Sequence, residues 1–200
     1  MPNASNISIN GTNSINFNSS SNRNNCLYAI ECDDYDCNLR LSGNGSLNIT
    51  ATETSNNYNI CGIDVHGDLT IDGPTIDINL SASKGTYPIK CTCFTFDNGN
   101  LTINEGNYKE GNAITIRDWY DTYTAGYFNL NGGKIVVNQN PSNSYGNNVL
   151  KTGIAVVGYF YINDGELDVI SNATKTINTT DDSAYAQKLQ FYLLVKVAAV

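Results

Sequence analysis

Residues 62–78, with the sequence GIDVHGDLTIDGPTIDI, contain three short apolar alternations separated by two turn-forming clusters. In each alternation two apolar side chains flank one polar residue, so both point to the same face of a strand. The clusters His66-Gly67-Asp68 and Asp72-Gly73-Pro74 favour bends and are too short to carry the chain back across a sheet. The segment therefore predicts three strands that turn two corners with their apolar side inside, which is one coil of a solenoid.

The three-strand pattern recurs along most of the chain. The first apolar residue of its middle strand falls at spacings of 27 to 32 residues, at Ile7, Leu39, Leu69, Leu101, Phe128, Phe160 and Leu189. This repeat predicts an all-β fold, a right-handed parallel β-helix of about six to seven coils, because parallel strands of one sheet are joined by right-handed connections. The alternative is a β-sandwich, whose hairpins would show two-residue turns at about 10-residue spacing.

We treat residues 1–200 as a single β-helix domain, and as a fragment of a longer protein because the chain begins inside a repeat. Two segments depart from the repeat. Residues 107–110 supply one apolar side chain where two are expected, so the third strand of the Leu101 coil is expected to fray. Residues 183–200 lack a glycine-bearing bend after Leu189, and we expect them to cap the last coil or to form a truncated one.

The charge of the chain limits its partners. Charged residues make up 15% of the chain, the formal net charge is -8 and the isoelectric point is near 4.4. Nucleic-acid binding needs clustered Lys and Arg, so we expect no nucleic-acid partner. No signal peptide and no apolar run of about 20 residues is visible. We expect a monomer without a membrane span, extracellular or at the cell surface, that binds cations or a neutral polymer.

Six cysteines stand at positions 26, 32, 37, 61, 91 and 93. Their spacing matches no paired zinc-binding motif. One interpretation is that Cys32 and several others are small apolar residues buried in the stack. The other is a disulfide between neighbouring coils, which requires an oxidising compartment.

The segments GIDVHGDLTIDG (residues 62–73) and LRLSGNGSLNIT (residues 39–50) resemble the β-helical carbohydrate-binding domains of surface and secreted proteins from clostridia and related bacteria. The resemblance covers most of residues 7–170. It implies a right-handed β-helix that binds plant cell-wall or other polysaccharide without catalysis, with calcium in some members. Members often carry Asp before the Gly of the incoming strand. Here Cys61 and Thr152 hold that place, so the resemblance does not carry calcium over to these two positions.

Carboxylates gather at the predicted corner after the first strand of each coil. The candidate ligands for Ca²⁺ are Asp33, Asp34, Asp36, Asp68 and Asp97. Stacked corners would bring oxygens from neighbouring coils together, and Ca²⁺ takes 6–8 oxygen ligands. The alternative is that Asp simply favours turns. Apart from this candidate calcium site, the sequence predicts no required cofactor.

A catalytic site is hard to assemble from this sequence. Glu31 and Asp64 are predicted at matching outward positions of adjacent coils, at the roughly 5 Å separation of a retaining glycosidase. Neighbouring strands of any solenoid share that spacing, so we assign no catalytic residue. Arg40 is predicted to face outward next to Thr70 with no carboxylate beside it, which does not resemble a lyase base. His66 is interpreted as a solvated turn residue.

Between Arg117 and Gly126 a corner expands into a loop that holds the only tryptophan. The candidate carbohydrate-binding residues are Trp119, Tyr120, Tyr123, Asp118, Asp121, Tyr127 and Tyr159, with Tyr161 close by. Aromatic rings pack against the apolar faces of sugar rings, while carboxylates and hydroxyls bond to sugar hydroxyls. The alternative is that Trp119 covers the strand expected to fray near Tyr108.

The sequence thus predicts a non-catalytic extracellular module that binds polysaccharide, either a plant cell-wall or a bacterial surface glycan. Two alternatives stay open. One is a structural stalk or adhesin segment of a cell-surface protein, which recognises nothing itself. The other is a β-helical polysaccharide lyase or hydrolase.

Overall fold

The computed structural model describes residues 4–19, 26–34, 37–54, 58–106, 111–117, 125–140, 151–171 and 175–180. These residues form an all-β structure, and no helix long and apolar enough to cross a membrane occurs among them. The strands are β1 (Ala4–Ser8), β2 (Thr12–Ser19), β3 (Leu27–Cys32), β4 (Asn38–Ser42), β5 (Ser46–Glu53), β6 (Asn59–Ala82), β7 (Gly85–Gly106), β8 (Gly111–Ile116), β9 (Gly126–Leu130), β10 (Lys134–Asn140), β11 (Lys151–Ile162), β12 (Glu166–Ser171) and β13 (Lys175–Thr180).

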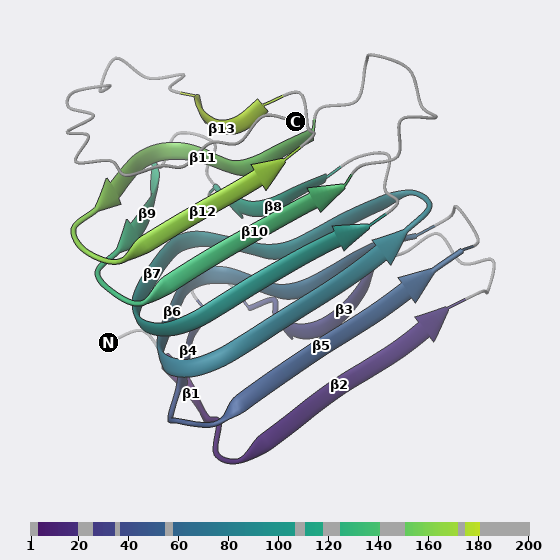
Figure 1. Cartoon of the computed structure of the whole chain (residues 1–200), viewed down its shortest axis with the longest axis horizontal. Helices are drawn as coiled ribbons and strands as arrows, with labels where there is room; N and C mark the ends of the chain where they lie inside the picture. The colour runs from purple at the N-terminus through teal and green to yellow at the C-terminus, as the bar shows by residue number, and fades with distance from the viewer. Residues whose placement is uncertain are drawn as a thin grey trace.

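Strands that lie far apart in sequence pair side by side, and all the described pairings are parallel (Figure 1). In the middle of the stack Leu39 pairs with Leu69, Leu69 with Phe94, Phe94 with Phe128 and Phe128 with Phe160. Side-chain hydrogen bonds between neighbouring strands join residues that are 25 to 34 positions apart. The spacing is therefore less regular than the predicted 27 to 32 residues.

Three long strands connect the short ones. β6, β7 and β11 bend along their length, so each pairs with different strands before and after its bend. As a result β7, β8, β11 and β9 pair in a closed ring of four parallel strands, and the remaining strands pair outward from it. The glycine-bearing clusters thus bend strands without ending them.

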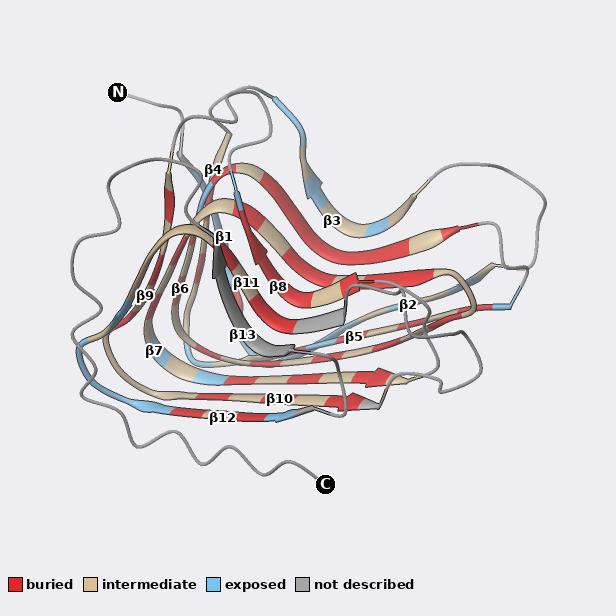
Figure 2. Ribbon diagram, turned by 90° about the horizontal axis from the view of Figure 1, so that it is seen from above, coloured by how far each residue is buried: buried red, intermediate tan, exposed pale blue. Residues whose placement is uncertain are grey.

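The core lies inside the bends, where apolar side chains of successive strands form columns (Figure 2). In β6 the side chains of Ile63, Leu69 and Ile76, which lie on its three straight stretches, are all fully buried. Burial alternates along β4, β5 and β9, as expected for strands with one inward and one outward face. The alternation read from the sequence is confirmed in these strands.

The assignment of Leu101 to the middle strand of a coil is wrong. Leu101 pairs with Ile76 and Ile135, which belong to the third strands, while Phe94 takes the middle position opposite Leu69. The physical reason is a register shift between Val65 and Asp68, where the bend of β7 is one residue shorter than that of β6. The third strand of this repeat is therefore the end of β7. Residues 107–110, predicted to be a frayed strand, lie outside the described residues.

Residues 183–200, predicted to be a cap or a truncated coil, also lie outside the described part of the chain. At the other end, β1 pairs with β4 so that Ile7 faces Leu41. The predicted alignment of Ile7 with Leu39 is therefore shifted by two residues. This shift preserves the inward face, because side chains alternate with a period of two.

Candidate carbohydrate-binding surface

A row of side chains crosses four neighbouring strands on the outer face of the middle stretch. Asp68 of β6 pairs with Cys93 of β7, Cys93 with Tyr127 of β9, and Tyr127 with Tyr159 of β11. These residues point outward because the residue after each one points into the core. The inward residues are Leu69, Phe94, Phe128 and Phe160.

The inward phenylalanines form an aromatic column directly behind this row. The ring centroids of Phe94 and Phe128 are 5.4 Å apart, and those of Phe128 and Phe160 are 4.5 Å apart in a stacked arrangement. Offset-stacked and tilted pairs at these distances stabilise a core beyond the burial of their area. The column therefore fixes the positions of β7, β9 and β11, and with them the outward side chains.

Two residues further along the same strands, a second row lies beside the first. Here Thr95 pairs with Asn129, and Asn129 with Tyr161. The rings of Tyr159 and Tyr161 are stacked, with centroids 6.1 Å apart and an interplanar angle of 17°, and Tyr161 is 44% exposed. We call Tyr127, Asn129, Tyr159 and Tyr161 the tyrosine face.

Hydrogen bonds hold the polar groups around the tyrosine face. The side-chain amide of Asn163 donates to Oδ1 of Asn129 and to Oδ1 of Asn131, both at 2.8 Å. Burial raises the pKa of Tyr127, and the nearby Asp68 carboxylate and Cys93 thiol raise it further, whereas a hydrogen bond with Thr95 lowers it. The phenol of Tyr127 is therefore protonated at neutral pH and able to donate a hydrogen bond.

The structure thus brings together two of the predicted carbohydrate-binding residues, Tyr127 and Tyr159, with Asp68, which was predicted as a metal ligand. Sequence reasoning missed Asn129. Its place between the inward Phe128 and Leu130 gave an outward position, but no motif marked it. The other predicted sugar-binding residues lie outside the described residues, in the loop that joins β8 to β9: Asp118, Trp119, Tyr120, Asp121 and Tyr123.

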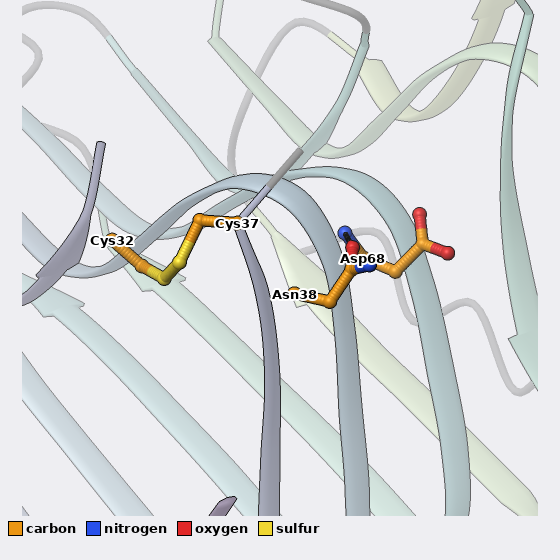
Figure 3. The surroundings of a disulfide bond; sticks show 4 residues. All are labelled: Cys32, Cys37, Asn38 and Asp68. Carbon is orange, nitrogen blue, oxygen red and sulfur yellow. Dashed lines mark hydrogen bonds between the residues drawn. A yellow bond between two sulfur atoms is a disulfide. The ribbon is translucent and has the colours of Figure 1, made fainter. Parts of the chain in front are cut away.

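The predicted calcium corner is divided between separate places. Cys32 and Cys37 form a disulfide with a Cα–Cα distance of 5.9 Å, which closes the corner that holds Asp33 and Asp34 (Figure 3). The interpretation of Cys32 as a buried apolar residue is therefore wrong. Next to this corner the backbone N–H of Asp68 donates to Asn38 Oδ1 at 2.7 Å, and the Asp68 carboxylate points away from the disulfide (Figure 3).

Asp97 does not share this corner. It lies after Phe96, at the next bend, and its Oδ1 accepts a hydrogen bond of 2.8 Å from Asn131. The expectation that Asp68 and Asp97 occupy matching corners came from the misassigned Leu101 strand and is wrong. Asp36 lies outside the described residues. Among the residues that are described, no three His, Cys, Asp or Glu side chains are grouped so that they could hold a metal ion.

A separate charged cluster crosses the outer side of the first stretch. Glu31 pairs with Asp64, as predicted, and Asp64 pairs with Lys90. Asp64 is only 1% exposed and forms an ion pair with Lys90, so the expectation that it faces open solvent is wrong. Partial burial raises the pKa of Glu31, and the neighbouring Asp33 and Asp64 add to the shift. The two carboxyl groups therefore differ in environment, and Asp64 is already engaged by an ammonium group.

Arg40 also has a carboxylate beside it, contrary to the sequence-based expectation. Its guanidinium forms an ion pair with Asp72, and both side chains are partly exposed. Asp72 belongs to the neighbouring strand and stands two positions after the predicted neighbour Thr70. The diagonal reach of a long side chain explains why alignment of strand positions alone did not reveal this pair.

No protein-family model, curated protein or solved structure matches this chain. The inference of function therefore rests on the chemistry of the described surface.

Proposed function

We propose that this chain is a right-handed parallel β-helix that serves as a non-catalytic extracellular module for binding polysaccharide. The parallel pairing of the described strands supports the architecture. The observation that carries the function is the tyrosine face, where aromatic side chains from adjacent strands lie side by side with an asparagine on the outer surface.

Sugar rings present apolar faces formed by C–H groups and polar edges formed by hydroxyl groups. The rings of Tyr159 and Tyr161 offer flat surfaces for the apolar faces, while the Tyr127 hydroxyl and the Asn129 amide serve hydroxyl groups. Tyr127 and Tyr159 stand on neighbouring strands, which are spaced about 4.8 Å apart. A glycan lying along this row would contact both residues at once.

The ligand expected here is a neutral glycan. The chain carries a net charge of -8, so an acidic polysaccharide such as pectin would be repelled overall. Asp68 lies at the end of the tyrosine row and would accept hydrogen bonds from sugar hydroxyls. The proposal needs no calcium at this surface, so retention should persist in a chelating buffer.

Affinity electrophoresis tests the proposal in gels cast with xylan, hydroxyethyl cellulose or pectin. We expect retardation by a neutral polysaccharide, with and without EDTA. The Tyr159→Ala and Tyr161→Ala variants should each lose about 1 kcal/mol of binding energy, roughly a fivefold rise in Kd. Trp119→Ala belongs in the same gels, because its loop leads into β9.

Tyr28→Ala is the matched control, since Tyr28 is 37% exposed but lies on β3, away from the tyrosine row. It should be retarded as strongly as the unsubstituted chain. Retardation that is equal in all variants would remove the tyrosine face from the site. Release of reducing ends or of unsaturated sugars would overturn the non-catalytic assignment.

A structural stalk or adhesin segment is the second candidate, and a ladder of asparagines favours it. On the outer face of the third stretch the amide of Asn104 donates to Asn79 at 2.8 Å, and that of Asn138 donates to Asn104 at 2.9 Å. Asn79 donates in turn to Asn48 at 3.2 Å. Such ladders use polar side chains to join strands, leaving fewer groups to bind a ligand. Absence of retardation in every gel would favour this alternative.

A further inference from the structure

Two cysteines that are far apart in sequence meet where β3 pairs with β6. Cys26 directly precedes β3, and Cys61 lies near the start of β6, where Leu27 pairs with Ile60 and Tyr28 with Cys61. The Sγ atoms of Cys26 and Cys61 are 2.9 Å apart. A disulfide bond is about 2.05 Å long, so a shift of less than about 1 Å would bring the two sulfur atoms to bonding distance.

We propose that Cys26 and Cys61 form a second disulfide when the protein meets an oxidised low-molecular-weight disulfide, and that this bond locks β3 onto β6. The reaction is thiol–disulfide exchange. The Cys26 thiolate attacks one sulfur of the reagent, which breaks the reagent's S–S bond, releases one thiolate and leaves a mixed disulfide on Cys26. The Cys61 thiol then gives up its proton and attacks the Cys26 sulfur. The second reagent thiol leaves, so two protein thiols are oxidised and one reagent disulfide is reduced.

The surroundings assign different roles to the two cysteines. Cys26 is half-buried, whereas Cys61 is 1% exposed, so a dissolved disulfide reaches Cys26 first. The hydrogen bond from Cys61 lowers the pKa of Cys26, and the Lys90 ammonium lowers it further, against the opposing effects of burial and of Asp64. The same hydrogen bond and burial raise the pKa of Cys61. Cys26 is therefore the attacking group and Cys61 the resolving one.

The position of the pair gives the bond a structural effect. Among the described pairings β3 contacts only β6, and it lies at the rim of the structure (Figure 2). The Cys32–Cys37 disulfide already closes the chain at the C-terminal end of β3. A Cys26–Cys61 bond would fasten the opposite end, so both ends of this strand would be held covalently. Such a bond persists in an oxidising compartment, where disulfides are stable.

Peptide mapping after incubation with oxidised glutathione tests the proposal. Free thiols are alkylated in denaturant, and the chain is cut after Glu and after Lys or Arg. Cleavage after Glu31 separates Cys26 from Cys32 and Cys37, and cleavage after Lys90 separates Cys61 from Cys91 and Cys93. We expect alkylated thiols to fall from four to two, with Cys91 and Cys93 remaining, and a peptide pair linked through Cys26 and Cys61.

Variants separate the two steps. Cys61→Ser should stop after the first step and retain one glutathione on Cys26, and Cys26→Ser should form neither the adduct nor the link. Cys93→Ser is the control, because Cys93 is also half-buried, and it should form the link normally. If no Cys26–Cys61 peptide appears in the unsubstituted chain, or if Cys26 joins another cysteine, the proposal is wrong. This mapping needs no variant, so a variant that fails to fold leaves the test intact.

Discussion

At the scale of single residues, Glu105 departs most clearly from the apolar pattern. It follows Leu101 and Ile103 at the next inward position of β7 and is 3% exposed. Its Oε1 accepts a hydrogen bond from the Thr86 hydroxyl and its Oε2 accepts one from the Gln139 amide, both at 2.6 Å. Burial nevertheless raises its pKa from 4.5 to about 7. A carboxyl group therefore sits in the core with a protonation state that changes near neutral pH.

The raised pKa makes stability depend on pH in a defined direction. Because the folded protein holds the Glu105 proton more tightly than the unfolded chain, this group's contribution is complete below pH 4.5 and is lost as the pH rises toward about 7. The loss amounts to about 3 kcal/mol. Urea unfolding at pH 4.5 and pH 8 should show this fall in the unsubstituted chain relative to Glu105→Gln, which keeps an amide of the same shape. A difference between the two proteins that is independent of pH would contradict the assignment.

At the scale of strands, the bends decide which side chains reach the surface. Gly158 lies within β11, between the part that pairs with β8 and the part that pairs with β9, directly before Tyr159. Its φ is +132°, and a Cβ added there would lie 2.1 Å from the carbonyl oxygen of Gly126. The position therefore excludes other residues for two reasons, a backbone conformation that L side chains rarely adopt and a backbone contact that cannot move aside.

Gly158→Ala should destabilise the fold by about 2 kcal/mol or more, from backbone strain and displacement of the neighbouring strand. It should also weaken glycan binding, because Tyr159 follows the bend. Gly106→Ala is the matched control: its nearest atom to an added Cβ is 3.9 Å away, and its φ is ordinary. Thermal unfolding of the two variants measures the difference. Equal melting temperatures would show that the bend of β11 tolerates a side chain.

The sequence allowed the strands to be recognised but not always placed. Alternation gave the inward faces correctly, because a period of two is visible in any apolar pair. It could not identify which stretch a pair belongs to, since Phe94/Phe96 and Leu101/Ile103 have the same pattern. Only the strand pairing shows that the bend after Cys91 lacks a residue. For the same reason Tyr127 and Tyr159 were placed correctly, whereas Asp97 was assigned to the wrong bend.

The contacts between cysteines were harder still to predict. Cys32 and Cys37 are five residues apart, yet their pairing depends on the path of the corner between them. Cys26 and Cys61 meet because β3 pairs with β6 in a register that begins at Leu27 and Ile60. Neither register nor loop path can be read from cysteine spacing alone, because six cysteines allow 15 full pairings.

At the scale of the whole molecule, parallel pairing sets how the chain must fold in time. The described strands form no hairpin, so even the first contact between strands closes a loop such as the one from Leu39 to Leu69. Closing a flexible loop of this length costs about 3 kcal/mol of chain entropy before the contact stabilises anything. Hairpins form in about 1–10 μs, but no such local step is offered here. The first pair of strands is therefore the rate-limiting nucleus, and later strands add to an edge that already exists.

Refolding should accordingly take milliseconds to seconds, as in other folds dominated by non-local pairing. Stopped-flow circular dichroism after dilution from urea measures the rate, and recovery of the full signal within the instrument's dead time would contradict this view. During that interval the edges of unfinished sheets are exposed to other chains, which can pair with them. The yield of native protein should therefore fall as the chain concentration rises, so the parallel architecture makes the assembly of this protein a competition between its own next strand and a strand from a neighbour.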